Sequence, residues 1–468
     1  MIKFCVRLVQ RWLPEPFIFA ILLTFVAAVV AIFGCHQTPV HVIEHWGGGV
    51  WNLLSFAMQM ALVLVCGSAL AAAPSIKRGI DALARIPKTP AVAIALVTVV
   101  SALACWLNWG FGLIIGVVFA KAIARQLAGV DYRLLIASAY SGFVVWHAGV
   151  SGSIPLTMAT EGEIGKVTNG AMNLTVSASH TIFDPHNLVM VLLVIVAITV
   201  ANTLMHPKKG AVTVDPKLLE EETLITHHSS LITEKTPAQR LEQSPILSWM
   251  IALLLAAYVV VKLGFRGGSL DLGTVIMIFF SLGLMLHGTP IAYVRAFGKA
   301  TTGAAGIILQ FPLYAGIMGI ITGEGELINI YSEFDPSIGE YIAKSEFAPS
   351  MGEYIAKWCV EVSTPVTYPL ITFLFAAVLN MFVPSGGGHW AIQAPIMLPA
   401  AATLGVDAGL TGTAIAWGDA WTNLIQPFWA LPALAIAKLS ARDIMGYCLV
   451  DLLITGVIIC GGLVIWAL

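Results

Sequence analysis

The sequence Val383-Pro384-Ser385-Gly386-Gly387-Gly388-His389-Trp390-Ala391-Ile392-Gln393 lies inside a long apolar segment, residues 370–401. A continuous transmembrane helix would be the ordinary interpretation of that segment. Glycine costs about 1 kcal/mol and proline about 3 kcal/mol at an interior helical position, so this stretch predicts a break in the helix. Irregular backbone at membrane depth is tolerated only where protein buries it or where it lines a wet cavity. We therefore interpret the break as part of a binding site.

The composition is that of an integral membrane protein. Of the 468 residues, 58% are hydrophobic and only 11% are charged, whereas soluble domains are about 25% charged. We expect membrane lipid around the protein. The net charge of -2 does not favour nucleic acid as a partner. The seven cysteines are scattered without CxxC spacing, so neither a disulfide framework nor a metal site is predicted.

Apolar runs predict an all-α polytopic membrane protein. Nine continuous spans are expected, at residues 16–34, 50–73, 134–160, 187–205, 246–264, 272–288, 300–321, 410–434 and 445–467. Two further apolar segments, 90–120 and 365–401, are interrupted in the middle. Residues 206–245 are polar and read as a cytoplasmic linker between two membrane parts, 1–205 and 246–468.

Basic residues give the expected orientation. Lys3, Arg7 and Arg11 place the N-terminus in the cytoplasm, and the parity of the spans places the C-terminus in the periplasm. Segment 90–120 begins beside Lys88 and ends beside Lys121. Both of its ends are therefore cytoplasmic, which predicts a re-entrant hairpin with its tip at residues 108–112; two short full crossings would give the same parity.

The second part of the chain repeats the first. Thr38-Pro39, Gly47 and Gln59 recur as Thr289-Pro290, Gly298 and Gln310 at one constant spacing, and Leu107-Asn108 recurs as Leu379-Asn380. The first Thr-Pro loop lacks basic residues, whereas the second precedes Arg295 and Lys299. This predicts two inverted-topology repeats, each with a re-entrant helical hairpin and a broken transmembrane helix, an architecture of secondary transporters.

A tandem duplication lies in a predicted external loop, residues 332–357. SEFDPSIGEYIAK is followed directly by SEFAPSMGEYIAK, and eleven of the thirteen positions are identical. Lengthening an exposed loop costs little free energy, so we interpret the duplication as tolerated, with a functional lid as the alternative.

Polar and small residues gather at the two hairpin tips and in two broken helices. The exposed amides of a glycine run suit an anion, although glycines also allow close helix packing. The predicted substrate-binding residues are Asn108, Gly110, Gly112, Ser151, Ser385, Gly386, Gly387, Gly388, His389, Trp390, Gln393 and Gln426. The predicted cation-coupling residues are Asp419, Asn423, Thr422 and Asn108, because an ionisable group inside a span is a functional candidate.

Histidine 147 and histidine 389 each have two interpretations. Histidine titrates near neutral pH, so either His147 or His389 suits proton coupling, and either suits a cavity wall equally well. Neither has a second ligand at helical spacing, so zinc is not predicted. The sequence holds no GxSxG, HExxH or GxxxxGK[ST] motif. We therefore expect transport without a cofactor rather than catalysis, with H⁺ or Na⁺ as a co-transported ion.

Three motifs resemble the bacterial short-chain fatty acid transporter family, within the ion-transporter superfamily. They are N-W-G-F-G-L at 108–113, V-P-S-G-G-G-H-W at 383–390 and Q-P-F-W-A-L-P-A-L at 426–434, and the match runs from W-L-P-E-P at 12–16 to A-R-D-I-M-G-Y-C at 441–448. The resemblance implies symport of monocarboxylates such as acetoacetate or butyrate across the bacterial inner membrane, by a protein that is often a homodimer. The duplicated loop departs from the family pattern.

Two other functions stay open at this point. One is transport of another organic anion, such as a di- or tricarboxylate, which a lysine or arginine in the cavity would favour. The other is a membrane-embedded enzyme or receptor, which a buried nucleophile–base pair at His147 or His389 would favour.

Overall fold

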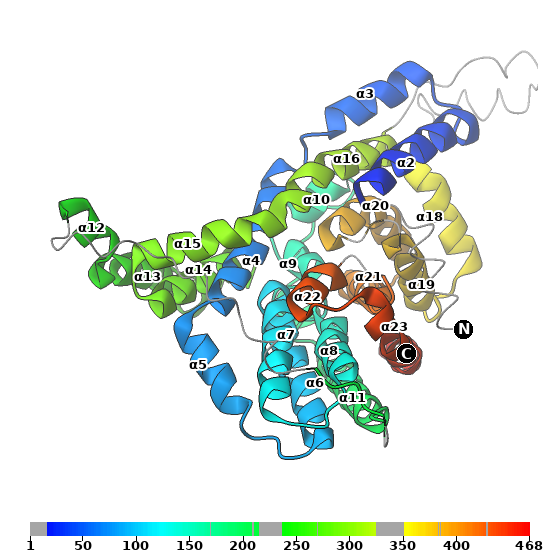
Figure 1. Ribbon diagram of the computed structural model, residues 1–468. Coiled ribbons are helices and arrows are strands. Elements are labelled where there is room, and N and C mark those ends of the chain that lie inside the picture. The colour runs from blue at the N-terminus through cyan, green and yellow to red at the C-terminus, as the bar shows by residue number, and fades with distance from the viewer. Residues whose placement is uncertain are drawn as a thin grey trace, which may run out of the picture.

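The computed structural model describes residues 16–168, 170–207, 210–214, 236–268, 270–323, 351–381, 383, 385–426 and 429–468. Within these residues every regular element is a helix (Figure 1). Seven helical segments are long and apolar enough to cross a bilayer. The prediction of an all-α polytopic membrane protein is therefore confirmed.

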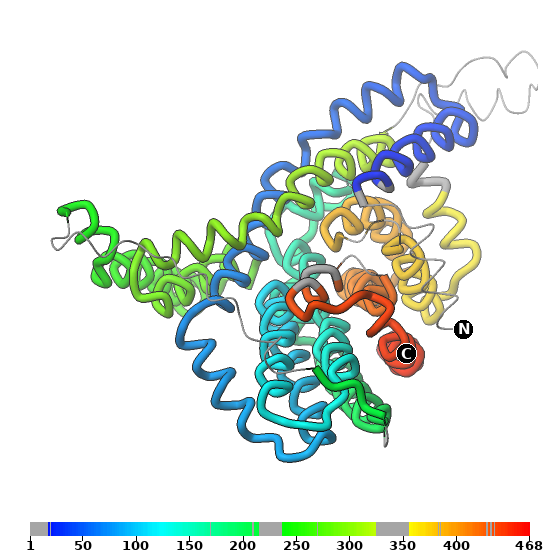
Figure 2. The backbone as a smooth tube through the Cα atoms, viewed as in Figure 1, coloured from blue at the N-terminus to red at the C-terminus, as the bar shows by residue number. Residues whose placement is uncertain are grey.

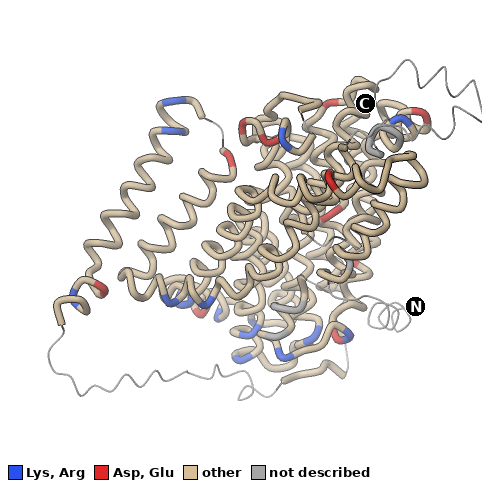
Figure 3. The backbone as a smooth tube through the Cα atoms, turned by 90° about the horizontal axis from the view of Figure 1, so that it is seen from above, with Lys and Arg blue, Asp and Glu red and all other residues tan. Residues whose placement is uncertain are grey.

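The surface has the polarity that a bilayer requires. Lys and Arg gather at the ends of the helices, and the middle of the molecule is almost free of them (Figure 3). Large apolar side chains such as Phe25, Leu192 and Val457 are 66%, 61% and 75% exposed. Exposed apolar side chains of this size are stable in contact with lipid, so these helices present their outer faces to the bilayer.

The first half of the chain forms helices interrupted at proline, glycine and asparagine. Its elements are α2 (Pro16–Val29) with the π-helical turn η1 (Val30–Gly34), α3 (Pro39–Gly49), α4 (Leu54–Ala71), α5 (Pro74–Leu83), α6 (Pro90–Leu107), α7 (Trp109–Gln126), α8 (Tyr132–Ser141), η2 (Gly142–Val145), α9 (Ser153–Met158), α10 (Glu163–Val167), η3 (Ala178–His180) and α11 (Pro185–Leu204).

The second half follows a short helix in the polar linker, α12 (Pro237–Glu242). Its elements are α13 (Pro245–Val260) with η5 (Val261–Phe265), α14 (Leu272–His287), α15 (Pro290–Thr301), η6 (Thr302–Ala304), α16 (Ala305–Thr322), α18 (Met351–Val362), α19 (Tyr368–Asn380), α20 (Gly386–Leu404), α21 (Ala408–Thr422), α22 (Ala430–Ala437) and α23 (Ala441–Ala467).

Two helices that correspond in the predicted repeat, α4 (Leu54–Ala71) and α16 (Ala305–Thr322), each pack against helices of the other half of the chain. α4 packs against α14 and α15, and α16 packs against α2 and α3, as Figure 1 shows. The spacing between the Thr-Pro motifs makes α3 equivalent to α15 and α4 to α16, so these two sets of contacts are reciprocal. Both α3 and α15 also begin with a threonine N-cap followed by proline. The internal repeat and the opposite orientation of the halves both stay predictions.

Both interrupted apolar segments break where the sequence predicts a break. Asn108 alone separates α6 from α7, which pack side by side (Figure 2). In the second half, residues 381–385 separate α19 from α20. α6 and α7 have 18 residues each, which is about 27 Å of helix and close to a bilayer core. Both helices are therefore long enough to cross the bilayer core, and the re-entrant arrangement stays a prediction.

The two predicted broken helices are also interrupted. α8 ends at Ser141, continues as the 3-10 turn η2, and gives way to turns before α9 begins at Ser153. The interruption starts at Gly142, inside the predicted span 134–160, where a tight 3-10 turn precedes Gly149 and Gly152. α21 ends at Thr422, and α22 begins at Ala430.

The linker and the duplicated loop lie largely outside the described residues. Residues 215–235 and 324–350 are not described, so the external position of the loop stays a prediction. The end of the second copy, from Met351, forms the beginning of α18. The motif at 12–16 lies outside the described residues except for Pro16.

Candidate functional site

The non-helical segment after η2 carries His147. The His147 ring stacks on the ring of Trp146, with ring centroids 4.0 Å apart and an interplanar angle of 9°. Ser153 Oγ lies 2.9 Å from His147 Nε2, and the Ile154 N–H donates to the same nitrogen at 3.1 Å. A ring nitrogen that accepts a hydrogen bond carries no proton, so His147 is neutral and protonated on Nδ1.

Asp419 lies on α21 between two histidines from different elements. His147 Nδ1 donates to Oδ2 at 2.7 Å, and His389 Nδ1, from α20, donates to Oδ1 at 3.1 Å. Both histidine side chains are 0% exposed and that of Asp419 is 1% exposed. Desolvation would strongly disfavour an isolated carboxylate at this depth, so the two ring donors are what keep it ionised.

The other side of the His389 ring faces a second acceptor. His389 Nε2 lies 2.5 Å from Gln393 Oε1, while Gln393 Nε2 donates to the carbonyl of Thr372 at 3.1 Å and so fixes the amide orientation. A histidine between two acceptors satisfies both only when both ring nitrogens carry protons. If Asp419 is ionised, this pattern corresponds to an imidazolium at His389 that is paired with the carboxylate. We call His147, His389, Gln393 and Asp419 the Asp419 cluster.

The second hairpin is tied to the same helix by Asn380, the last residue of α19. Asn380 Nδ2 donates to the carbonyl of Asp419 at 2.8 Å, to Thr422 Oγ1 at 2.9 Å and to Asn423 Oδ1 at 3.3 Å. From the first half, the hydroxyl of Tyr140 donates to the carbonyl of Asn423 at 2.7 Å. The end of α21 is thus held by both halves of the chain.

The first hairpin tip is tied to the first broken helix. Asn108 Oδ1 accepts a hydrogen bond from the Phe111 N–H at 2.9 Å and so caps α7, while the Trp109 N–H donates to Ser151 Oγ at 2.9 Å. Asn108 Nδ2 is buried and has no hydrogen-bond partner. The tip therefore leaves one donor free, at the place where the sequence predicts substrate contact.

Glycines at the first tip allow close packing. A Cβ on Gly110 would lie 3.0 Å from the carbonyl oxygen of Leu64, and one on Gly112 would lie 2.2 Å from the backbone nitrogen of Cys105. Gly110 and Gly112 therefore allow α7 to pack closely against α4 and α6, as expected if these glycines serve helix packing rather than anion binding.

The glycine triplet is packed just as closely against other helices. A Cβ would lie 2.4 Å from Ser153 Oγ at Gly386, 2.6 Å from Phe56 Cε1 at Gly387, and 2.4 Å from Tyr314 Cδ2 at Gly388. Close packing accounts for all three glycines. Gly386, the first residue of α20, lies beside His147 and Ser153, and anion binding by residues 385–388 stays a prediction.

The structure brings some predicted site residues together and separates others. His389, Gln393 and Asp419 share one cluster, and Thr422 and Asn423 lie beside it through Asn380. Within the described part of the chain, no hydrogen bond joins Asn108 or Ser151 to Asp419. Trp390 and Gln426 are buried, at 1% and 2% exposure.

Three residues of this region were not among the predicted site residues. His147 completes the cluster, and no local pattern signals its partner. Asn380 could have been found from the sequence, because it corresponds to Asn108 in the predicted repeat. Asp451 is a second carboxyl in an apolar run. It could have been found from the sequence, because it lies inside the predicted span 445–467.

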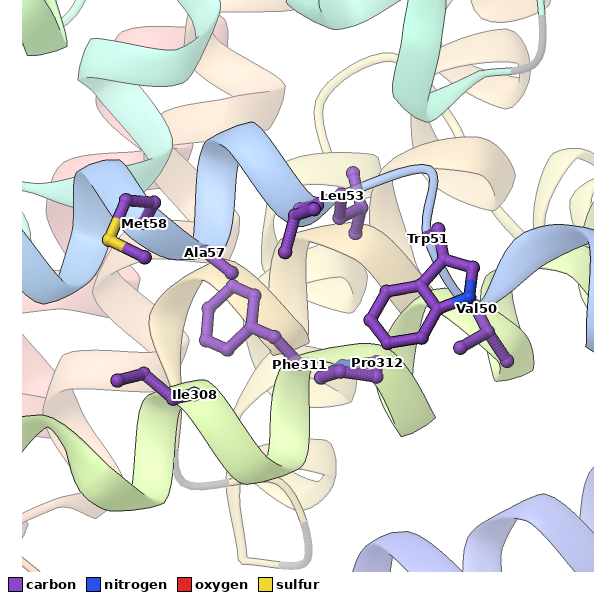
Figure 4. Close-up of a pocket in the computed structure, with 9 residues that line it drawn as sticks. Val50, Trp51, Leu53, Ala57, Met58, Ile308, Phe311 and Pro312 are labelled. Carbon is purple, nitrogen blue, oxygen red and sulfur yellow. The ribbon is translucent and has the colours of Figure 1, made fainter.

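A small apolar pocket lies between α4 and α16, next to the glycine triplet (Figure 4). Figure 4 shows Ala57 and Met58 of α4 facing Ile308 and Phe311 of α16. The pocket has a volume of about 30 Å³, which is enough for a water molecule or two. It is too small for a four-carbon acid.

Comparison with known proteins gives two relatives that cover almost the whole chain. A candidate short-chain fatty acid transporter of Escherichia coli strain K12 is 42% identical over 465 residues, 99% of each chain. A protein with the same description from Haemophilus influenzae is 40% identical over 471 residues, 98% of each chain.

Solved structures of two transporters share the fold. The YdaH transporter of Alcanivorax borkumensis, which has an unusual topology, superposes with a TM-score of 0.57 at 15% identity, covering 97% of this chain and 98% of its own. MtrF of Neisseria gonorrhoeae, from a class of antimetabolite efflux pumps, gives a TM-score of 0.57 at 16% identity, covering 99% and 97%. At this identity the likeness establishes the fold alone.

The family relationship rests on the whole length of the sequence. A profile of the family described as Short chain fatty acid transporter matches residues 1–466, and the two bacterial relatives agree with it. The chain therefore belongs to the short-chain fatty acid transporter family.

Proposed function

We propose that the protein is a secondary active transporter that moves short-chain monocarboxylates, such as acetoacetate or butyrate, together with protons across the bacterial inner membrane. One observation carries the choice of coupling ion: His389 lies between two hydrogen-bond acceptors, Asp419 and Gln393, in a site closed to solvent. That arrangement can hold a proton between His389 and Asp419.

The geometry favours a proton over Na⁺ at Asp419. Both carboxylate oxygens already accept hydrogen bonds from ring nitrogens. A hard cation prefers several oxygen ligands, and nitrogen donors that carry protons repel it. The Asp419 cluster therefore suits H⁺ in this conformation.

A monocarboxylate fits the charge of the site. One substrate anion moving with one proton is electroneutral, and the first turn of α20 offers free amides for a single carboxylate. The hydrogen-bond partners of the Asp419 cluster include no lysine or arginine. A di- or tricarboxylate would require such additional donors, so we favour monocarboxylates.

The proposed mechanism is alternating access. Substrate enters when α20 moves away from Ser153 and Tyr314, which now fill the space beside residues 386–388. Ser385 and the amides of the triplet bind the carboxylate, Trp390 forms the apolar wall, and the Asp419 cluster exchanges its proton with the side that is open. The proposed orientation keeps the N-terminus in the cytoplasm and the C-terminus in the periplasm.

Uptake by proteoliposomes tests this function. We expect labelled acetoacetate and butyrate to accumulate when the external pH is lower than the internal pH, with no stimulation by a Na⁺ gradient. Protein-free liposomes are the control, because neutral butyric acid crosses bilayers unaided. Preference for a dicarboxylate, or uptake driven by Na⁺ alone, would contradict the proposal.

A second candidate function follows from the contact between Ser153 and His147. Ser153 Oγ, His147 and Asp419 lie in the order of a nucleophile, a base and an orienting carboxylate, with distances of 2.9 and 2.7 Å. The Ile154 N–H occupies the base nitrogen, however, and Ser153 is only 2% exposed. We therefore favour transport over acyl transfer.

The variant Ser153→Ala separates these two functions. Transport predicts that the variant retains most acetoacetate counterflow and that the purified protein does not hydrolyse 4-nitrophenyl butyrate. Ester hydrolysis that disappears in Ser153→Ala would establish the enzymatic function instead.

A further inference from the structure

Asp451 is a carboxyl outside the Asp419 cluster. It lies on α23 in an apolar run, and its side chain is 0% exposed. α23 packs against α8 and α11. Burying an unpaired carboxylate costs several kcal/mol, so the site requires either a cation or a proton.

The neighbours of Asp451 are polar but uncharged. Ser141 Oγ, at the end of α8, lies 2.5 Å from Asp451 Oδ2, and the side-chain amide of Asn202 on α11 lies beside the carboxyl. Asn202 Nδ2 in turn lies 3.4 Å from Thr98 Oγ1 on α6. All four side chains are 0% exposed, so four helices enclose the carboxyl.

No cation balances the charge of Asp451 within the described residues. Arg133, the single basic residue of α8, interacts with Tyr447 instead. On α21, Asp419 is occupied by the two histidines. The remaining titratable side chains on α23 and on the helices around it are Arg442, Asp443, Tyr447, Cys448, Cys460, Tyr132, Tyr140, Cys105, Tyr368 and His186. Neither of the basic groups among them, Arg442 and His186, interacts with the Asp451 carboxyl.

The polar atoms around Asp451 lack one hydrogen-bond donor. The Ser141 hydroxyl has a single hydrogen but faces two acceptors, the Ala137 carbonyl at 2.8 Å and Asp451 Oδ2. Asp451 Oδ1 and Asn202 Oδ1 are buried, and no hydrogen bond of normal length reaches either oxygen, although the Asn202 amide lies next to the carboxyl. A proton on the Asp451 carboxyl would both supply the missing hydrogen-bond donor and neutralise the negative charge.

We propose that the Asp451 carboxyl is a proton-binding site and that it holds a proton in this conformation. A sodium ion would need five or six oxygen ligands, by analogy with other hard cations, whereas only two oxygens here lack a hydrogen bond of normal length. No group of three metal-binding side chains occurs among the described residues. A neutral carboxyl also lets α23 pack directly on α8 and α11 without water between them.

Infrared difference spectroscopy of the purified full-length protein tests the site without any transported substrate, so its result is independent of the proposed function. At pH 7 we expect the wild-type spectrum to contain the carbonyl stretch of a protonated carboxylic acid and the Asp451→Asn spectrum to lack it. Thr455→Val is the matched control, because the Thr455 hydroxyl donates to the backbone carbonyl of Asp451 and not to its carboxyl. That variant should retain the band.

The variant Ser141→Ala provides a second measurement if Asp451→Asn does not fold. Loss of the hydroxyl should shift the carboxylic acid band to higher frequency without removing it. Absence of any band that depends on residue 451 or 141 would overturn the proposal. So would a melting temperature that Na⁺ raises in the wild type but not in Asp451→Asn, because that result identifies a sodium site.

Discussion

At the scale of single residues, Asp419 is the point where the two halves of the chain share a charge. His147 belongs to the first half, and His389 and Asp419 belong to the second. The sequence predicted that His389, Gln393 and Asp419 are functional, because polar side chains inside apolar segments require a reason. Their pairing could not be predicted, because the bond from His147 joins residues 272 positions apart and depends on how two interrupted helices meet.

The variant Asp419→Asn should lose proton-driven acetoacetate uptake by roughly ten- to a hundredfold, since hydrogen bonds to charged groups contribute about 1.5–3 kcal/mol. The amide cannot hold the imidazolium of His389. Asp443→Asn is the control, because Asp443 is a half-buried capping residue of α23 that lies outside the Asp419 cluster. Coupled uptake by Asp419→Asn at the wild-type rate would exclude this role.

The two histidines should differ when they are replaced. His389→Gln removes the stored proton, so we expect loss of the response to a pH gradient while counterflow at equal pH continues. His147→Gln removes a neutral donor and should slow both activities while the pH response remains. Measurement of both activities on each variant distinguishes the roles, and identical behaviour would contradict the assignment of the proton to His389.

At the scale of secondary-structure elements, the positions at which helices are interrupted could be predicted from the sequence. The helices that pack against these interruptions could not. The first break lies at Asn108, whose side chain caps α7, and the second lies at the residues before Gly386. The purpose of the glycine triplet was ambiguous, because the helices that pack against it come from distant parts of the chain. The bulky rings of Phe56 and Tyr314 beside Gly387 and Gly388 are a property of the tertiary structure alone.

The variant Gly388→Ala should destabilise the protein by about 1–3 kcal/mol through overpacking against Tyr314. The matched control is Gly461→Ala on α23, where no atom lies within 4 Å of the added Cβ and where alanine favours the helix by about 0.5–1 kcal/mol. Melting temperatures in detergent measure both effects. Equal changes in the two variants would show that the triplet is not tightly packed.

The turn between α13 and α14 should show a pH-dependent contribution to stability. Burial raises the pKa of Asp271, but hydrogen bonds from Lys262 and Thr274 outweigh burial and leave the pKa below its usual value. Because the pKa is lowered in the folded state, the stabilisation is present above the usual aspartate pKa of 3.8 and disappears as the pH falls through the lower, folded value.

The measurement compares wild-type and Asp271→Asn melting temperatures across this pH range. We expect the wild type to be more stable at pH 7 by about 1 kcal/mol, with a difference that vanishes at the acidic end. Glu163→Gln, which breaks a more exposed pair with Lys166, should have little effect at any pH. A difference that persists unchanged in acid would refute the ion pair as its cause.

At the scale of the whole molecule, the sequence indicated an all-helical membrane protein with an internal repeat, because composition and motif order are global properties. The exchange of helices between the halves could not be predicted, because equivalent motifs do not specify which neighbours they contact. α4 and α16 each pack with the first helices of the other half, and the spacing of Thr38 and Thr289 alone gives no sign of this.

Thiol labelling should reveal movement of the whole molecule. Five described cysteines are buried: Cys35, Cys66, Cys105, Cys359 and Cys448. With Cys460 and Cys5 replaced, Ser385→Cys supplies a reporter. We expect a membrane-impermeant maleimide to label it slowly at rest and faster during acetoacetate transport, but not in Asp419→Asn. Labelling that ignores substrate would contradict alternating access.

The sharing of Asp419 between halves also fixes an order of events. Any separation of the first half from the second breaks the bond from His147 but leaves the pair of Asp419 and His389 intact, because α20 and α21 belong to the same half. In the proposed cycle, oxygen Oδ2 is then the first atom of the pair to meet water, and opening would precede release of the proton. A solvent deuterium isotope effect on the turnover rate is therefore expected only under conditions in which proton release is the slowest step. No isotope effect is expected when the opening motion is slower.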